Sequence, residues 1–437
     1  MSLAVIALIL FVSIFLLILY GYPVAFTLGG MSLIYAFCFL DAGDLSLLPN
    51  RIMGTMSTTV LVAVPLFIFM GIMLEKSGLA ERMLATMAGL FGKMRGGMAI
   101  SVVIVGALLA ASTGIVGATV ITMGLISLPP MLQRGYKPEL ATGIISASGT
   151  LGQIIPPSVV LVLLGSVLGV SVGQLFRAAL WPGLLLVGSY IGYILLLSRI
   201  RPSYFPKVGE EGSLQSEGSP KTVPLRSTVE SFVLPFLLIL AVLGSIFAGW
   251  ATPTEASAIG ALGATLLTLY QRKFNLPILR QVMQETTHLT SMVFMILLGA
   301  TTFSLVFRKL GGDRYLVDLI EQAQLAPSTF LALVMIVVFF AGFFIDFIEI
   351  IFIIVPVVAP IFVEMEVDLV WFGILMALNL QTSFLSPPFG FALFYLKGVA
   401  PPEVKTGHLY RGIIPFLIIQ VIILALVVLF PEWLGVV

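Results

Sequence analysis

The chain carries a double-proline break twice, at corresponding places in two similar halves. Residues 152–158 read GQIIPPS and residues 383–389 read SFLSPPF, so that Pro156-Pro157 and Pro387-Pro388 stand 231 residues apart. Other landmarks repeat at nearly the same spacing, namely Pro129 with Pro360, Pro182 with Pro415, and residues 75–78 with 308–311. Each proline pair interrupts a long apolar segment. Paired broken helices in two repeats are the best sequence indication of a transporter's binding site.

The composition places the chain in a membrane. Of its 437 residues, 59% are hydrophobic and 10% are charged, whereas a soluble domain carries about 25% charged residues. Apolar runs of about span length recur from end to end, without the alternation that the strands of a membrane barrel require. The pattern predicts an all-α polytopic membrane protein. Its first apolar run is interpreted as a transmembrane helix and not as a signal peptide.

Several function classes find no support in the sequence. The net charge of +1 does not indicate a nucleic-acid partner, and a single cysteine, Cys38, leaves no internal disulfide or metal-ligand cluster. A phosphate-binding Gly-Lys-Ser/Thr loop is missing, so ATP is not expected to be the direct energy source. No nucleophile and base form a recognisable set, and we do not expect an enzyme.

Two apolar stretches, 97–130 and 328–362, are too long for one membrane span and too short for two. Breaks at 111–114 and 342–346 predict that each stretch folds as a re-entrant hairpin, whose non-helical tip must be buried in protein or face water. One long tilted helix is the alternative for each. Ordinary helices are expected near residues 3–20, 22–40, 54–74, 139–165, 174–198, 229–249, 254–270, 286–307, 369–395 and 412–430.

The basic residues orient this arrangement. With the N-terminus outside, 17 of the 22 Lys and Arg residues fall in inner loops, which is the bias that the positive-inside rule demands. In this topology the first hairpin opens to the inside and the second to the outside, so the two halves are inverted. Two ordinary spans in place of either hairpin would give the same orientation. The five basic residues left outside are Arg51, Arg177, Arg308, Lys309 and Arg314.

The proline pairs predict cation sites. Each pair removes backbone donors and frees carbonyl groups one turn earlier, and free carbonyls are costly in hydrocarbon unless a partner satisfies them. Na⁺ is a hard cation that suits such carbonyls and nearby hydroxyls. Hydroxyl residues stand just upstream of both breaks, in Ser148-Gly149-Thr150 and in Gln381-Thr382-Ser383. A simple proline kink is the structural alternative, but the duplication beside hydroxyl clusters favours a function.

The hairpin tips predict the substrate region. The first tip carries Ser112-Thr113-Gly114, and the second carries Gly342 and Asp346. Helix N-termini at such tips present N–H groups and a positive dipole end, which favour an anionic substrate. An ionisable residue in an apolar span costs about 2.5 kcal/mol or more and is a functional candidate by default. Asp346 is therefore a candidate for cation or substrate handling, whereas Glu349 fits a structural pairing with a basic group elsewhere equally well.

Together these motifs resemble the large membrane subunit of tripartite ATP-independent periplasmic (TRAP) transporters. The resemblance covers essentially the whole chain and is carried by AASTG at 110–114, GTLGQIIPPS at 149–158, ATPTEA at 251–256 and SPPFG at 386–390. It implies an elevator-type, Na⁺-driven importer of organic acids. It also implies two partners, a small four-helix membrane subunit on a separate chain and a soluble periplasmic binding protein.

The resemblance further implies roles for individual residues. One Na⁺ site is expected between Ser112 and the break at Gly149-Thr150, and a second between Gly342 and Thr382-Ser383, so that two or more ions are carried. Substrate is expected between the tips, near Ser112, Thr113, Ser158 and Asp346. The implied transport domain comprises 97–173 and 328–395. The scaffold comprises 1–96, 174–327 and 396–437. Within it, 75–96 and 308–326 are predicted arm helices, and 202–226 is a predicted cytoplasmic linker.

The sequence thus predicts an inner-membrane importer that couples Na⁺ to a carboxylate delivered by a binding protein. Two other hypotheses stay open. One is an ion-coupled carboxylate transporter of related fold that needs no binding protein, and the other is a passive anion channel lined by the re-entrant ends. The sequence does not identify the carboxylate.

Overall fold

A computed structural model describes residues 3–91, 94–206 and 229–432 of the chain. Regular structure within these ranges is helical throughout. Six of the described helices are long and apolar enough to cross a membrane, and a bent pair makes a seventh if it counts as one span. The prediction of an all-α polytopic membrane protein is confirmed. Residues 207–226 of the predicted linker lie outside the described residues.

The first hairpin consists of α7 (Gly97–Thr113) and α8 (Val116–Gln133), which pack against each other. The chain reverses at Gly114, whose φ of +63° lies in the left-handed region that glycine adopts without strain. A Cβ atom there would lie 2.9 Å from a methyl carbon of Val159. The break predicted at 111–114 is confirmed, and a single long helix over this stretch is excluded.

The second hairpin consists of α17 (Pro327–Ala341), α18 (Phe347–Ile353) and α19 (Val355–Glu364). The rings of Phe330, near the start of α17, and Phe362, near the end of α19, lie 5.0 Å apart between centroids. The two legs are therefore antiparallel, and the break predicted at 342–346 is confirmed. The second leg bends by 50° between α18 and α19, which the sequence analysis missed. Pro356 follows this bend and has no backbone N–H to continue the helix.

Both proline pairs separate two helices. The first lies between α9 (Pro138–Gly149), which continues into the short 3₁₀ helix η2 (Leu151–Gln153), and α10 (Val159–Leu168). The second lies between α20 (Leu369–Leu385) and α21 (Phe391–Val399). Both Pro–Pro peptide bonds are cis. The expected helices 139–165 and 369–395 are therefore each divided in two, as their prolines predict.

Two scaffold helices differ from their predicted bounds. The helix expected at 54–74 is divided into α4 (Leu47–Met56), the 3₁₀ helix η1 (Thr59–Val62) and α5 (Ala63–Lys76). At the division the Thr58 hydroxyl donates to the Gly54 carbonyl oxygen (3.2 Å). Such side-chain hydrogen bonds compete with the backbone hydrogen bonds of a helix. The helix expected at 286–307 is α15 (Leu276–Lys309), whose 34 residues reach well beyond the bilayer core of about 30 Å.

The remaining helices agree with their predicted positions. Short helices stand at the predicted arms, α6 (Leu79–Phe91) before the first hairpin and α16 (Gly312–Gln322) before the second. The other described elements are α1 (Leu3–Leu19), α2 (Val24–Phe39), α3 (Ala42–Leu45), α11 (Val172–Ile200), η3 (Pro202–Tyr204), the π-helical η4 (Val229–Val233), α13 (Leu234–Phe247), α14 (Pro253–Tyr270) and α22 (Thr406–Leu429).

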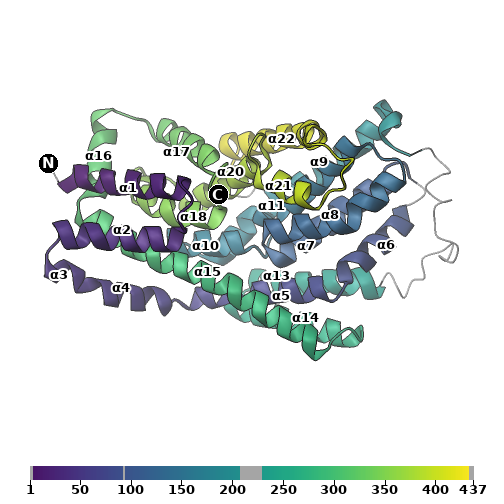
Figure 1. Ribbon diagram of the computed structural model, residues 1–437, viewed down its shortest axis with the longest axis horizontal. Coiled ribbons are helices and arrows are strands. Elements are labelled where there is room, and N and C mark those ends of the chain that lie inside the picture. Colours follow the sequence, from purple (N-terminus) through teal and green to yellow (C-terminus); the bar gives the residue numbers. More distant parts are fainter. Residues whose placement is uncertain (1–2, 92–93, 207–228, 433–437) are drawn as a thin grey trace.

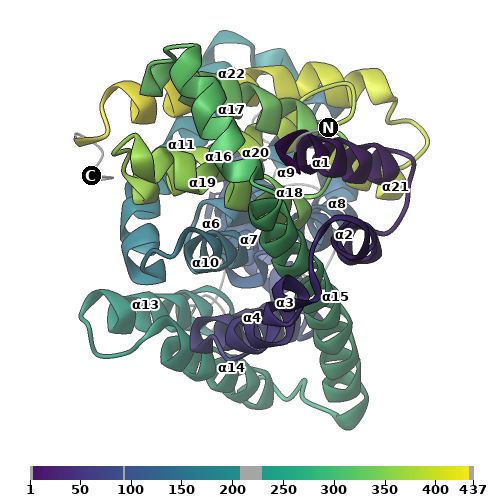
Figure 2. The same ribbon diagram turned by 90° about the vertical axis from the view of Figure 1, so that its left-hand side faces the viewer.

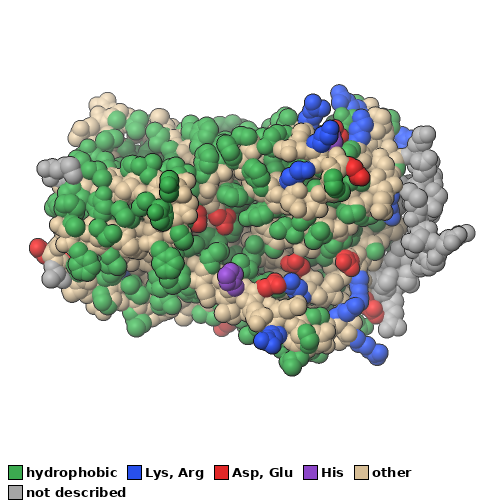
Figure 3. Space-filling model, in the orientation of Figure 1, with side chains coloured by type: hydrophobic (Ala, Val, Ile, Leu, Met, Phe, Trp, Pro, Cys, Tyr) green, Lys and Arg blue, Asp and Glu red, His purple; other side chains and the backbone are tan. Residues whose placement is uncertain are grey.

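The elements form an elongated helical body. Figure 1 shows α1, α16 and α17 toward one end of the long axis, with the N-terminus, and α6, α8 and α9 toward the other. Seen from the first end, α13 and α14 lie on one side of the bundle, whereas α17, α20 and α22 lie on the opposite side (Figure 2). On the face in Figure 3, Lys and Arg side chains gather at the end that holds α6, and hydrophobic side chains cover most of the rest.

Candidate functional site

A cavity of about 230 Å³ lies where the two hairpin tips and the two breaks meet. The first tip contributes Ile115, Val116 and Gly117, and the second contributes Asp346, Phe347 and Ile348. The broken helices and the scaffold helices α5 and α15 complete the lining with Val159, Phe384, Tyr395, Ile68, Leu289, Met292 and Val293. Segments more than 200 residues apart in the chain thus enclose one space.

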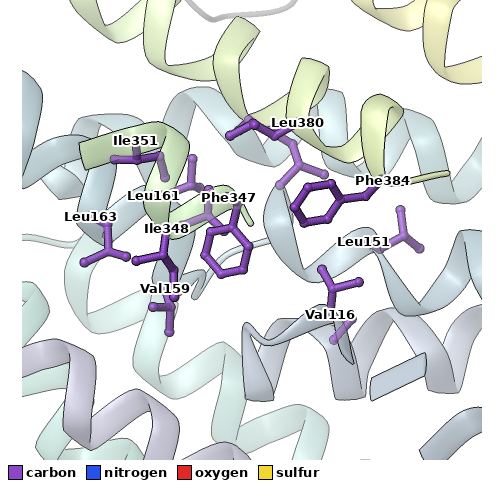
Figure 4. Close-up of a cluster of buried hydrophobic side chains, with 14 of the residues drawn as sticks. Val116, Leu151, Val159, Leu161, Leu163, Phe347, Ile348, Ile351, Leu380 and Phe384 are labelled. Atoms are coloured by element: carbon purple, nitrogen blue, oxygen red, sulfur yellow. The ribbon is translucent and has the colours of Figure 1, made fainter. Parts of the chain in front are cut away.

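The walls of this cavity are mainly apolar. Val159 directly follows the first break, Phe347 follows the second tip, and Phe384 precedes the second break. The rings of Phe347 and Phe384 lie 6.2 Å apart between centroids. Figure 4 shows these side chains gathered from separate helices in one buried cluster. An apolar cavity with few polar groups is the usual form of a small-molecule site.

Asp346 is the acidic residue in the cavity lining, and it also caps the N-terminus of α18. Its Oδ1 accepts a hydrogen bond from the backbone N–H of Phe347 (2.7 Å), and its own N–H donates to Oε2 of Glu349 (3.3 Å). Glu349 therefore has a structural partner in the backbone and not in a basic side chain. Among the described residues no Lys or Arg pairs with Asp346. The first free N–H of this tip is bound by the protein's own carboxylate and is not available to a substrate.

The predicted hydroxyl residues of the first tip are buried but do not line the cavity. The Ser112 hydroxyl donates to the Leu109 carbonyl oxygen (2.8 Å), and Thr113 bonds the same oxygen (3.1 Å) and the Thr119 hydroxyl (2.6 Å). Ser158 is also buried and donates to the Gln153 carbonyl oxygen (2.9 Å). These three side chains bond backbone carbonyls at helix ends and are not among the residues that line the cavity.

The first tip and the first break are in close contact, as the predicted cation site requires. A Cβ atom at Gly152 would lie 2.1 Å from the Ala110 carbonyl oxygen, and one at Gly149 would lie 2.5 Å from a methyl carbon of Val120. On the scaffold side, a Cβ atom at Gly71 would lie 2.5 Å from the Ser112 carbonyl oxygen. Backbone carbonyls of the tip are therefore concentrated beside glycines of the break and of α5.

The second tip and the second break are also in contact. A Cβ atom at Gly342 would lie 2.3 Å from Oγ of Ser383, and that hydroxyl donates to the Phe339 carbonyl oxygen (2.7 Å). Thr382 donates to the Leu378 carbonyl oxygen of its own helix (2.7 Å). Gly342 and Ser383 are therefore in contact, whereas the Thr382 hydroxyl bonds a carbonyl of its own helix.

The two broken helices meet each other at equivalent positions. Nε2 of Gln381 lies 3.4 Å from Oγ1 of Thr150, and these residues are 231 positions apart, the spacing of the proline pairs. Both side chains are buried. The side-chain amide of the buried Gln153 has no hydrogen-bond partner for its nitrogen or its oxygen among the described residues. The centre of the body thus holds uncompensated polar groups, which buried sites seldom carry without a function.

Comparison with known proteins identifies the family. The family model described as "Tripartite ATP-independent periplasmic transporter, DctM component" matches residues 11–433. The chain belongs to this family. It is therefore a TRAP transporter large permease, a multi-pass membrane protein of a transport family and not of an enzyme family.

Individual relatives span nearly the whole permease. The C4-dicarboxylate TRAP transporter large permease protein DctM of Pseudomonas aeruginosa is 31% identical over 394 residues, which cover 88% of this chain and 89% of that one. The sialic acid TRAP transporter large permease protein SiaM of Vibrio cholerae is 28% identical over 414 residues, 94% of each chain. The solved YdaH transporter of Alcanivorax borkumensis has a similar fold, with a TM-score of 0.60, 15% identity and 98% coverage of both chains.

Two polar residues of the permease escaped the sequence analysis. Nδ2 of Asn379 donates to the Met335 carbonyl oxygen (2.7 Å) and ties α20 to the second hairpin. Asn379 stands four residues before Ser383, which was predicted as a site residue. Residues at this spacing lie on the same face of a helix, so the sequence could have indicated Asn379 as well. Tyr395 on α21 lines the cavity and lies 3.1 Å from the position of a Cβ atom at Gly117. The sequence could have indicated Tyr395 too, because it is a residue with a polar hydroxyl in an apolar segment just after the second break.

Proposed function

We propose that this chain is the permease of a Na⁺-coupled importer that carries an organic acid across the inner membrane. The cavity enclosed by both tips and both breaks carries the proposal, because segments from the two similar halves line it together. Relatives are named for C4-dicarboxylates, sialic acid and ectoine, each of which has a carboxylate group. A carboxylate is therefore the proposed substrate class.

The cation part of the proposal rests on charge. Asp346 borders the cavity without a basic partner among the described residues. Beside an organic anion, a lone carboxylate would be repelled in a medium of low dielectric constant. A bound cation removes this conflict, and the carbonyls and hydroxyls at Ser112, Gly149-Thr150 and Gly342 with Ser383 supply the oxygen atoms that a hard cation prefers. We propose two or more Na⁺ ions at these contacts.

An elevator movement would carry this site across the membrane. The cavity has one wall from the proposed transport domain, 97–173 and 328–395, and another from the scaffold helices α5 and α15. A site between two bodies opens to either side when one slides against the other. The N-terminus lies at the end of the molecule away from the gathered Lys and Arg (Figures 1 and 3), which supports an outside N-terminus.

The proposed partners are a small four-helix membrane subunit and a periplasmic binding protein, because the family's description names one component of a tripartite assembly. Uptake in proteoliposomes that needs the binding protein would separate this proposal from a binding-protein-independent transporter. Uptake against a concentration gradient would exclude a passive channel.

We expect uptake to require Na⁺ on the side of the binding protein. Two Na⁺ ions with a monoanion move one net charge, which gains about 2.3 kcal/mol from a potential of 100 mV. Replacing Na⁺ by K⁺ should therefore abolish accumulation, and an inside-negative potential should increase it. Radiolabelled carboxylate uptake into proteoliposomes measures both effects, with protein-free vesicles as the control. Equal uptake in Na⁺ and K⁺ would contradict the coupling.

A further inference from the structure

A second cavity of about 720 Å³ lies between the scaffold helices α4 and α15 and the helices α10, α18 and α19 of the proposed transport domain. Its volume falls within the range of about 300–1,000 Å³ that small-molecule sites occupy. Its lining is rich in hydrogen-bonding side chains, among them Arg51, Thr55, Thr301, Ser304, Arg308 and Glu364.

The two cavities are lined by different residues of three shared helices, α10, α15 and α18. On α15, Met292 lines the smaller cavity and Ser304 lines the larger one. Twelve residues of helix correspond to about 18 Å. Likewise α10 runs from Val159 at the first cavity to Ser166 at the second. The larger cavity therefore lies along the helices that border the candidate site, at the end toward Lys309, where α4 also lies (Figure 1).

Two arginines give this cavity its charge. Of the five basic residues on the predicted outer side, Arg177 donates to the Phe247 carbonyl oxygen and Lys309 pairs with Asp44 (2.8 Å). Arg51 and Arg308 both line the cavity. Among the described residues they have no ion pair or hydrogen bond from their guanidinium groups, and Glu364 is the one carboxylate in the lining.

Hydroxyl groups stand beside these arginines. Oγ1 of Thr55 on α4 lies 3.4 Å from Oγ1 of Thr301 on α15 and joins the two helices across the cavity wall. Ser304 stands one turn further along α15, toward Arg308. Guanidinium groups bind carboxylates through two parallel hydrogen bonds, and hydroxyls can add further donors. The lining therefore suits an organic anion better than a cation or a neutral solute.

We propose that this cavity is a receiving site for the carboxylate substrate on the outer side of the membrane, where Arg51 and Arg308 hold the anion before it reaches the site between the tips. The inference rests on the proposed import of an organic acid. It adds a second binding site, at which the positive charges of the two arginines are required. Positive charge at the predicted outer ends of α4 and α15 runs against the usual bias, which is consistent with a functional reason for keeping it.

Cysteine chemistry tests the charge of the cavity directly. Cys38 is the single native cysteine, so C38S gives a cysteine-free background into which S304C introduces a probe in the cavity wall. An anionic and a cationic methanethiosulfonate reagent are compared for their reaction rates in the purified transporter. We expect the ratio of anionic to cationic rates to fall by about tenfold or more when R51Q and R308Q are added, because focused positive potential raises local anion concentration to that extent.

Three controls make the result specific. R314Q removes an exposed arginine of the same outer segment that does not line the cavity, and it should leave the ratio unchanged. The pair R51K and R308K keeps both charges and should also keep the ratio, which separates charge loss from misfolding. Succinate or sialic acid, but not a neutral polyol of similar size, should slow labelling of S304C only when the arginines are present.

Three outcomes would overturn the proposal. An unchanged rate ratio in the double glutamine variant would show that the arginines do not set the potential of the cavity. Failure of both anions to protect S304C would show that no carboxylate is held there. Protection by the substrate-free binding protein, but not by the anions, would assign the arginines to a protein contact. Labelling requires neither Na⁺ nor uptake, so these results are independent of the coupling experiment.

Discussion

Replacing Asp346 by asparagine should lower Na⁺-driven uptake by about 10- to 100-fold, since an interaction with a charged group contributes about 1.5–3 kcal/mol. Asparagine caps a helix about as well as aspartate does, so D346N keeps the start of α18 while removing the negative charge from the cavity. The Na⁺ concentration for half-maximal uptake should rise. Initial uptake rates over a Na⁺ series in proteoliposomes measure both quantities.

The matched control is D368N. Asp368 also caps a helix, because its Oδ1 accepts from the N–H of Trp371 at the start of α20 (2.7 Å), but it is exposed and does not line the cavity. This variant should transport at the normal rate. Equal uptake by D346N and the unmodified protein, at every Na⁺ concentration, would remove Asp346 from the site.

Replacing Gly152 by alanine should abolish most uptake and destabilise the protein. The new Cβ atom would lie 2.1 Å from the Ala110 carbonyl oxygen, so the backbone of the first tip and the first break must separate. Overpacking of this kind costs about 1–3 kcal/mol, and here it displaces the carbonyls of the proposed cation site. Thermal unfolding of the purified protein, with and without Na⁺, and uptake in proteoliposomes measure the two effects.

G188A is the control for this change. Gly188 lies within α11, and nothing is found within 4 Å of the position its Cβ atom would take. Alanine is favoured over glycine inside a helix by about 0.5–1 kcal/mol, so this variant should be at least as stable as the unmodified protein and should transport normally. If G152A also transports normally, tight contact between tip and break is not required for function.

Repetition made the central architecture predictable, because glycines, prolines and an aspartate interrupt long apolar runs at matching places. The residue pattern predicted the turn at Gly114 and the interruption between Gly342 and Asp346, and breaks of this kind cannot lie against lipid. Helix ends in polar segments were harder to predict. In α15 the residues before Thr286 are too polar to count as a span, yet they continue the same helix.

Side-chain direction limited the prediction of the site. Ser112 and Thr113 are at the first tip as expected, but their hydroxyls bond the carbonyl of Leu109 one turn back. A serine or threonine in a helix has this local alternative at every position, so sequence alone does not tell which way the hydroxyl turns. At the first break the cavity is bordered by Val159 in place of Ser158, whereas at the second tip both Asp346 and the next residue, Phe347, line it.

The contact between Thr150 and Gln381 also bears on how such a chain can evolve. In a symmetric homodimer, a residue on the twofold axis meets its own copy, so any substitution there changes both sides of the contact at once. Here the equivalent positions belong to one polypeptide and carry different side chains, a hydroxyl facing an amide. Because both positions belong to one chain, each can mutate alone. An arrangement that began symmetric can then acquire a single carboxylate, Asp346, on one side of a shared cavity.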